Sequence, residues 1–460
     1  MELRNGAVIE HAREGVRLWE PGNTSSTGGV LIAQDATFRN CRRAVEGMKY
    51  EGFAAHDPSI RLPNRTRFNR VHFVVDNDYR GGTDFDTHVS LWGMEGVNFV
   101  ECTWENLQST VTKSADLGHG ITSHESSFRV LPGCSSLQQL GSPCPPADVL
   151  PSVFRNLDHA IHATNGNGQS FTVDRAAFEN NVIGVYTNSV HGFSVTRNTF
   201  VLGERGVLLN GDVDQELLGR HRGVFSHESH GFIIEDNALS MSNNPQAGAE
   251  GIVVGYNRDF NDVVRRNTAS GLEVGFVGEG ICSDVQNGGL GFIGLQHECN
   301  TNISNAVNHW DRMVETAPLP EQPLHSMRLN QGTGSTPARN QFDQETGTLD
   351  ESDFKRTSEN GVLMYHYGGL GDVEPLDNTP TWVETAFASN NPPGCPARSY
   401  PVGRLTGVQK ALLGDSLEDA KLAYGNLRYA YNALVDGGST DAVVAEISST
   451  WPEEAWALRA

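Results

Sequence analysis

The chain lacks any run of 18 apolar residues, so we expect no membrane-spanning helix. It is also short of positive charge, because 34 Lys and Arg face 56 Asp and Glu, a formal net charge of −22. That balance repels nucleic-acid phosphates and anionic membrane surfaces, so we expect neither as a partner. It suits divalent cations and neutral ligands such as glycans.

Several catalytic and metal signatures are missing as well. The sequence holds no P-loop, no Gly-x-Ser-x-Gly, no His-Glu-x-x-His and no Cys-x-x-Cys pair. No signal peptide follows Met1, and the last residues, WPEEAWALRA, read as an unfinished helix. We therefore expect the chain to be part of a longer polypeptide.

Cysteine is scarce, at seven residues. Cys41 and Cys102 lie in strand-like segments and are predicted to be buried free thiols. The disulfide candidates are two pairs, Cys134 with Cys144 across the loop PGCSSLQQLGSPCPP, and Cys282 with Cys299. Disulfides favour an oxidising compartment, so we expect an extracellular or cell-surface location.

Glycine is abundant, at 50 residues, and stands in a recurring pattern. The segments FRNCRRAV, FRNLDHAI and FENNVIGV share an aromatic residue, an Asn at +2 and a small plus a β-branched residue at +6 and +7. The period-two alternation around them predicts β-strands. The aromatic or equivalent zero positions of the repeat are Ile9, Phe38, Phe68, Trp104, Phe128, Phe154, Phe178, Phe200, Leu239 and Ala269.

The spacing of these positions predicts a β-solenoid. The shortest intervals are 22–26 residues, and longer ones carry polar insertions. Sequential parallel strands connect with a right-handed turn. We therefore predict an all-β solenoid, a right-handed parallel β-helix of ten or more coils. Phe154, Phe178 and Phe200 should share one interior row, with neighbours about 4.8 Å apart, and Asn at +2 should adopt the left-handed conformation of a tight turn.

The domain organisation follows from where this pattern fades. The β-helix is predicted over residues 1–370, with regular coils in 1–290 and irregular final coils in 290–370. Residues 371–405 contain TPTW, NNPPGCP and SYP and are predicted to be a Pro-rich linker. Residues 406–460 show helical periodicity and are predicted to form a small α-helical segment.

Two segments carry a family resemblance. The coil VLIAQDATFRNCRRAV and the tail RYAYNALVDGGSTDAVVAEI resemble the right-handed β-helix regions of large secreted or surface proteins of Bacteroidota, exported by the type IX system, within the pectin-lyase-like superfamily. The resemblance implies a surface location and no established chemistry. The C-terminal sorting domain of such proteins is not in this sequence.

The segment LGHGITS is similar to the Gly-His-Gly segment of β-helix polygalacturonases. The other motifs of that family, Asn-Thr-Asp, Asp-Asp and Arg-Ile-Lys, are missing. The alignment above places His119-Gly120 at the same position as His191-Gly192 and His230-Gly231. We therefore interpret the His-Gly pair as a turn of the scaffold.

The insertions between coils hold the candidate ligand contacts. DNDYRGGTDFDTH offers Asp76, Asp78, Asp84 and Asp86, oxygen ligands of the kind that Ca²⁺ takes; the alternative is a solvated acidic loop. The insertions at 47–58, 76–92 and 211–227 leave one edge of the coils and would build a continuous wall of loops. The candidates for sugar contact on these insertions are Tyr50, His56, Tyr79, Phe85, Trp92 and Arg222, unless they pack their own loops.

Two functions follow from these observations. The first is a non-catalytic extracellular or surface β-helix, structural or adhesive, that binds polysaccharide or other surface glycans. The alternative is a carbohydrate-active enzyme, a polysaccharide lyase or glycoside hydrolase. The two differ in whether carboxylates, or a carboxylate and a Lys or Arg, converge within about 10 Å on a sheet face.

Overall fold

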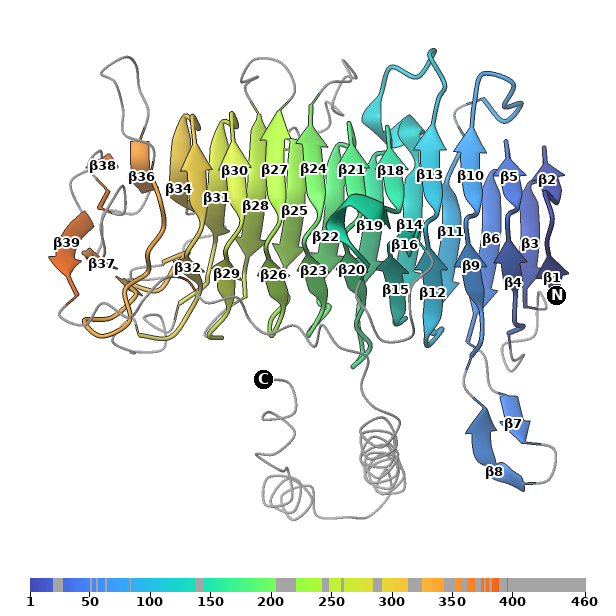
Figure 1. The fold of residues 1–460 in the computed structure, drawn as a ribbon, viewed down its shortest axis with the longest axis horizontal. Helices are drawn as coiled ribbons and strands as arrows, with labels where there is room; N and C mark the ends of the chain where they lie inside the picture. The colour runs from blue at the N-terminus through green and yellow to red at the C-terminus, as the bar shows by residue number, and fades with distance from the viewer. Residues whose placement is uncertain are drawn as a thin grey trace, which may run out of the picture. The chain divides into compact units, whose positions relative to one another are not determined.

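A computed structural model describes residues 1–19, 28–49, 52–54, 57–62, 64–82, 84–136, 144–203, 221–241, 248–257, 260–283, 292–312, 325–342, 352–356, 362–368, 374–375, 378–379, 383–388 and 395. The chain divides into two units, residues 1–135 with 146–396, and residues 136–145 with 397–460. The first unit is an all-β parallel β-helix whose strands form three stacked sheets (Figure 1). The helical segment predicted over 406–460 lies outside the described residues.

Sheet A is formed by the first short strand of each coil. Neighbouring strands are parallel and pair in the order in which the coils follow one another. Its strands are β1 (Glu2–Leu3), β4 (Ile32–Gln34), β9 (Arg67–Asn69), β12 (Val97–Val100), β15 (Phe128–Leu131), β20 (Thr172–Asp174), β23 (Ser194–Thr196), β26 (Ile233–Glu235), β29 (Val263–Arg265) and β32 (Gln296–Glu298).

Sheet B contains the second short strand of each coil, and it holds the repeat position from which the sequence was aligned. Its strands are β2 (Val8–Glu10), β5 (Thr37–Arg39), β10 (His72–Val75), β13 (Thr103–Asn106), β18 (Val153–Arg155), β21 (Ala177–Glu179), β24 (Thr199–Leu202), β27 (Ala238–Met241), β30 (Thr268–Ser270) and β33 (Thr301–Ile303).

Sheet C has the longest strands and continues beyond the other two. Its strands are β3 (Glu14–Leu18), β6 (Arg43–Met48), β11 (Thr87–Trp92), β14 (His119–His124), β19 (His159–Thr164), β22 (Ile183–Asn188), β25 (His221–His227), β28 (Ala249–Gly255), β31 (Val274–Glu279), β34 (Val307–Arg312), β36 (Ser352–Arg356) and β38 (Asn378–Thr379).

Smaller elements accompany the three sheets. Two antiparallel pairs and one three-stranded parallel sheet lie on the insertions and in the last coils, together with two 3₁₀ helices. They are β7 (Gly52–Ala54) with β8 (Asp57–Leu62), β16 (Gly133–Cys134) with β17 (Val149–Leu150), β35 (Asn330–Gln331) with β37 (Leu363–Tyr367) and β39 (Val383–Phe387), η1 (Ser114–Leu117) and η2 (Pro146–Asp148). Among the described residues, no helix is long and apolar enough to span a membrane.

The predicted interior row exists. Phe154 pairs in register with Phe178, and Phe178 with Phe200; their rings stack at 5.0 Å and 4.4 Å between centroids. All three side chains are buried. Stacking like residues at the strand spacing keeps the core filled from coil to coil without requiring a constant repeat length.

Two of the ten aligned positions were wrong. Phe68 and Phe128 belong to sheet A, where they pair with Phe99 and Val97, and the sheet B row instead contains Phe73. Phe68 and Phe73 are both buried apolar side chains on adjacent short strands of one coil. Because both strands alternate with the same period, hydrophobicity does not tell them apart.

The turns explain the Asn of the repeat. Asn40, Asn156 and Asn180, all at +2, have φ between 54° and 58°, the left-handed conformation predicted for them. A different set of Asn residues forms the stack of bonded amides, at −2 of the later coils. The members of this stack, in which each main-chain N–H and side-chain amide donates to the next Oδ1, are Asn198, Asn237, Asn267, Asn300 and Asn340.

The cysteines differ from the prediction at one pair. Cys134 and Cys144 are both disulfide-bonded. The pairing of Cys282 with Cys299 was wrong, because Cys299 bonds to Cys395 and Cys282 is a buried free thiol. Sequence spacing missed this bond, since it joins residues 96 positions apart.

The bond to Cys395 also bears on the predicted linker. Within 371–405, β38 pairs with β36 and β39 pairs with β37. These described parts of the stretch therefore belong to the final coils. The final coils have a small separate core, made of Ala338, Phe342, Phe354, Leu363 and Tyr365.

Candidate functional site

The outer face of sheet C carries a group of imidazoles on two neighbouring strands. Along β14 the side chains of His119, Thr122 and His124 are partly exposed, while Ile121 and Ser123 between them are buried. His119 pairs in register with His159 of β19, and Thr122 with His162. We call His119, Asp158, His159 and His162 the imidazole cluster.

The backbone fixes where this cluster begins. Gly118 has φ 64°, and a Cβ there would lie 2.3 Å from the ring of Phe85, so the turn into β14 requires glycine. The N–H of His119 donates to the carbonyl of Asp86, and the N–H of Asp158 donates to the carbonyl of Gly118, both at 2.9 Å. Main-chain bonds between coils therefore hold the first residues of β14 and β19 side by side.

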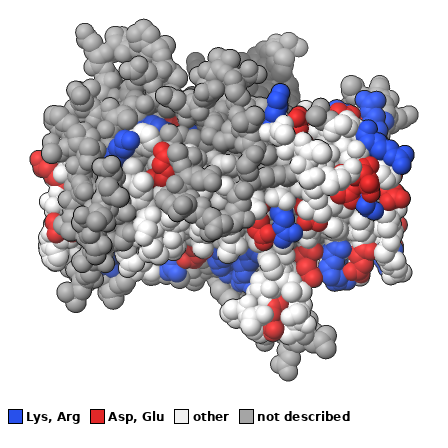
Figure 2. Space-filling view, turned by 90° about the horizontal axis from the view of Figure 1, so that it is seen from above, with Lys and Arg blue, Asp and Glu red and all other residues white. Residues whose placement is uncertain are grey.

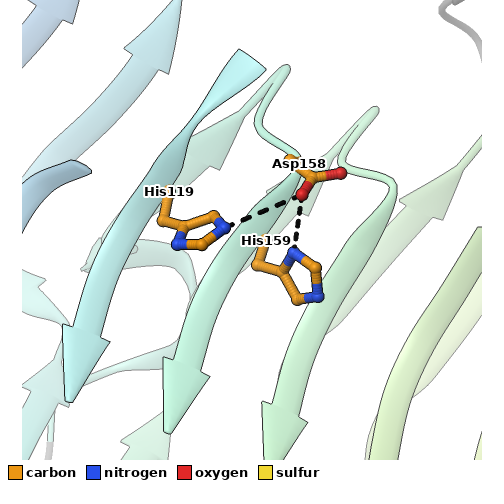
Figure 3. A group of neighbouring side chains, drawn as sticks. All are labelled: His119, Asp158 and His159. Atoms are coloured by element: carbon orange, nitrogen blue, oxygen red, sulfur yellow. Dashed lines mark hydrogen bonds and ion pairs between the residues drawn. The ribbon is translucent and has the colours of Figure 1, made fainter. Parts of the chain in front are cut away.

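The side chains of the cluster converge on one carboxylate (Figure 3). Oδ2 of Asp158 lies 2.9 Å from Nδ1 of His159 and 3.7 Å from Nε2 of His119. The three side chains are between 16% and 24% exposed. The ring of His162 lies 5.0 Å, between centroids, from each of the other two imidazoles, and Tyr186 of β22 follows at 5.1 Å.

A chain of hydrogen bonds sets the tautomer of His119. Oγ1 of Thr87 donates to the carbonyl of Val89, and Oγ1 of Thr122 donates to Oγ1 of Thr87. Each hydroxyl has a single proton, so Thr122 accepts from Nδ1 of His119, 3.2 Å away. The proton of a neutral His119 is therefore on Nδ1, and its Nε2 presents a lone pair toward Asp158.

Burial favours the neutral form of two of the imidazoles, His119 and His162. Desolvation lowers the pKa of His119, and it outweighs the hydrogen bond that only the protonated imidazole could donate to Asp158. Desolvation, followed by the charges of His159 and His119, lowers the pKa of His162 to about 3. Desolvation raises the pKa of Asp158, but the positive charge that His159 can carry and the hydrogen bonds that protonated His119 and His159 can donate outweigh it, so that pKa is well below its usual range. The site thus combines an ionised carboxylate, Asp158, with two imidazoles, His119 and His162, that burial keeps neutral.

The interpretation of His119 as a scaffold turn was wrong. His191 and His230 do lie in turns between sheets C and A, where their rings stack at 3.7 Å. His119 lies instead on a strand of sheet C. The error arose because Phe128, from which its position was counted, belongs to sheet A.

The predicted calcium ligands do not converge. Asp76 and Asp78 bind Arg39, whose guanidinium lies 2.7 Å and 3.2 Å from them. Asp86 binds Arg43 at 2.6 Å. Asp84 accepts from the hydroxyl of Tyr79 at 2.6 Å and lies 3.5 Å from Arg42.

These carboxylates therefore neutralise arginines of the neighbouring coil. Acidic and basic side chains accordingly lie side by side over the N-terminal coils, at the right of Figure 2. The Ca²⁺ expectation finds no support in the described positions of the four side chains.

The candidate sugar contacts differ in exposure and in the partners that their side chains bind. Trp92 is 48% exposed and its ring lies 4.7 Å from that of His124. Phe85 is buried, and the hydroxyl of Tyr79 is bound to Asp84. Arg222 is 1% exposed, paired with Glu250 at 2.9 Å, and unable to contact a sugar from there. Tyr50 and His56 lie outside the described residues.

Sequence reasoning missed Asp158, His159 and His162. A usable signal was present in the strands themselves, because HGITSH (119–124) and HAIHAT (159–164) align residue by residue on sheet C. Strands β15 and β18 and the insertion between them separate the two segments in the sequence. This separation hid the correspondence.

Comparison with known proteins assigns no family to the chain. No family model, no curated protein and no solved structure matches the chain. The assignment of a function therefore depends on the geometry of the imidazole cluster.

Proposed function

We propose that the chain acts on an extracellular polysaccharide, which it holds across the outer face of sheet C and cleaves by acid–base catalysis at the imidazole cluster. One observation carries the proposal: His119 presents a bare Nε2 beside the ionised carboxylate of Asp158 on a partly exposed sheet face. A neutral imidazole with a fixed tautomer is the commonest general base in enzymes.

The side chains favour elimination over hydrolysis. Glycoside hydrolases use two carboxyl groups about 5–9.5 Å apart, whereas the cluster contributes one, Asp158. The nearby carboxylate of Asp86 is bound to Arg43. In an elimination on a uronate-containing chain, Nε2 of His119 takes the proton beside the sugar carboxylate. His159, held by Asp158 through Nδ1, protonates the departing oxygen from Nε2, a step that requires the imidazolium form of His159 and leaves it neutral.

A binding surface adjoins the cluster on the same face. Trp92 pairs in register with His124, five residues along β14 from His119. Five residues of strand span roughly 16 Å. An exposed Trp at that distance offers a stacking platform for a sugar ring of the same polysaccharide.

The proposed location is extracellular or cell-surface. The disulfide between Cys299 and Cys395 supports it, since such bonds persist in oxidising compartments. We further propose that the chain belongs with the β-helix regions of secreted Bacteroidota proteins that its coils resemble, within the pectin-lyase-like superfamily.

The test is a degradation screen with the full chain. Uronate-containing and neutral polysaccharides are incubated with wild type, His119→Gln and His72→Gln, the last a matched control on sheet B. Unsaturated ends and reducing ends are measured separately. We expect unsaturated ends from wild type and control, and a rate at least about 100-fold lower for His119→Gln. Absence of cleavage throughout the panel, or full activity of His119→Gln, contradicts the proposal.

A non-catalytic surface stalk or adhesin is the second candidate. It is favoured by the unbroken stacking of the sheet B row from Phe38 to Phe200, which makes the coils a stiff support. A glycan array separates the two functions: binding that Trp92→Ala weakens, without cleavage of the bound glycan, selects the second.

A further inference from the structure

We infer that His119, Asp158 and His159 form a binding site for a divalent transition metal of the Zn²⁺ type. The inference does not depend on polysaccharide cleavage, because the ligand geometry exists without any substrate. It differs also from the Ca²⁺ expectation, which concerned other residues and a harder cation.

The distances fit such an ion. One ring nitrogen from each histidine and one oxygen of Asp158 all lie within 4.8 Å of one another. Ligands placed about 2.0–2.1 Å from zinc in a tetrahedron are roughly 3.3 Å apart. The two separations from Oδ2 of Asp158, 2.9 Å to Nδ1 of His159 and 3.7 Å to Nε2 of His119, fall on either side of that value. Binding of the ion would therefore require only that the more distant atom, Nε2 of His119, move closer to Asp158.

The hydrogen bonds prepare His119 as a ligand. Its Nε2 lone pair faces an anionic oxygen at 3.7 Å, an arrangement that is repulsive until a cation lies between them. Its Nδ1–H is held by Thr122, which Thr87 holds in turn. Metal-bound histidines have such a partner on the second ring nitrogen, which fixes the tautomer and the ring orientation.

The remaining groups complete the site. His159 donates Nδ1–H to Asp158 in the absence of metal, and it releases that proton, to its own Nε2 or to solvent, when Nδ1 binds the ion. Three protein ligands leave a fourth tetrahedral position open. The ring of His162 lies 5.0 Å from both histidine ligands, and its buried Nδ1 has no hydrogen-bond partner among the described residues.

The ligand set selects the metal. Two imidazole nitrogens and one carboxylate oxygen suit Zn²⁺, Co²⁺, Ni²⁺ and Cu²⁺, whereas Ca²⁺ and Mg²⁺ require six or more oxygens. The two histidine ligands also lie on paired strands, and Asp158 directly precedes β19, so the ligands are held more rigidly than on a loop insertion. We therefore expect discrimination against Ca²⁺ even at a large excess.

The experiment titrates chelator-treated full chain with Zn²⁺ by calorimetry and with Co²⁺ by visible absorption, which reports tetrahedral coordination directly. We expect one ion per chain, no binding of Ca²⁺, and a visible Co²⁺ band. His119→Gln and His159→Gln should each weaken Zn²⁺ binding by at least about 100-fold, while His72→Gln leaves it unchanged.

A milder variant guards against loss of folding. Thr122→Val keeps every ligand but removes the acceptor for Nδ1–H of His119, so we expect roughly tenfold weaker binding with the Co²⁺ band retained. Failure of the wild type to bind Zn²⁺, or wild-type affinity in His119→Gln, overturns the inference. A bound ion would occupy the Nε2 of His119 that acts as the base, so cleavage is measured on the metal-free chain. Failure of Zn²⁺ binding then leaves the cleavage test untouched, and the reverse also holds.

Discussion

The outer face of sheet C has two halves that share one backbone geometry and differ in their side chains. The polar half comprises the outward residues of β3, β6, β11, β14 and β19, among them Arg43, Thr87, His119 and His159. The apolar half comprises those of β22, β25, β28 and β31, where Ile183, Phe225, Val253, Val274 and Val277 are buried in one cluster. Register and strand pairing are the same in both.

The difference shows that the coils alone do not define a site. Among the described strand residues of the apolar half, Arg222, Glu250 and Glu279 belong to a buried network, which Arg312 of the next strand, β34, completes. Each of these four side chains is at most 8% exposed. In the polar half, Arg43, His119 and His159 keep contact with solvent, as the proposed chemistry on an external polymer requires. The apolar half is a packing surface, and we place the function in the polar half.

We expect the largest difference in stability loss when one carboxylate is neutralised in each half. Glu250→Gln leaves the buried guanidinium groups of Arg222 and Arg312 short of a counter-charge, and we expect it to lower the free energy of unfolding by about 3–5 kcal/mol. Glu14→Gln removes a partly exposed partner of Arg17 on the polar half, and about 1 kcal/mol or less should be lost. Denaturant unfolding of both variants checks the contrast, and equal losses would refute it.

A similar comparison of stability loss can be made inside the coils, between an Asn of the amide stack and a Ser at the same position. Asn237 is buried, accepts from Asn198 and donates to Asn267, so Asn237→Ala should cost about 2–3 kcal/mol by leaving these amides unpaired. Ser152, at the same position of an earlier coil, makes two hydrogen bonds, and Ser152→Ala should cost about 1 kcal/mol. Thermal unfolding of the two variants measures both losses of stability. A larger loss in Ser152→Ala than in Asn237→Ala would contradict the prediction.

Acid should act on the polar half through His162. An unfolded histidine titrates near about 6.5, whereas desolvation, with the charges of His159 and His119, lowers the pKa of His162 to about 3 in the folded chain. The unfolded chain therefore binds this proton first. The contribution of neutral His162 is complete above about pH 6.5 and is lost as the pH falls toward 3.

The corresponding variant is His162→Phe. Between about pH 7 and pH 4, wild type should lose on the order of 1–3 kcal/mol more stability than this variant. Unfolding measured across that range tests it. An identical pH dependence of the two proteins would show that His162 is not held neutral by the fold.

The smallest effect concerns ligand contact. Trp92→Ala on the polar half should weaken binding of the responsive polysaccharide about tenfold, because a stacking surface is lost. Phe292, 58% exposed and outside the three sheets, supplies the matched control, and Phe292→Ala should leave affinity unchanged. Equal weakening by both changes would argue against a binding surface on sheet C.

The sequence predicts the fold well and the site poorly, for a common reason. Rows such as Phe154, Phe178 and Phe200 recur at short intervals, so their stacking is predictable from periodicity. The cluster instead needs the register between β14 and β19, which is lost once Phe128 is counted on the wrong strand. The bond from Cys299 to Cys395 is hidden in the same way, because its partners become neighbours only through the folded final coils.

Both proposals depend on one proton position, that of His119. Selective ¹⁵N-histidine NMR of the metal-free full chain, assigned by comparison with His119→Gln, reports which ring nitrogen carries the proton. We predict a neutral imidazole at pH 7 with the proton on Nδ1, bound to Thr122, and a bare Nε2. A proton on Nε2, or an imidazolium ion paired with Asp158, would contradict both the proposed base and the proposed metal ligand.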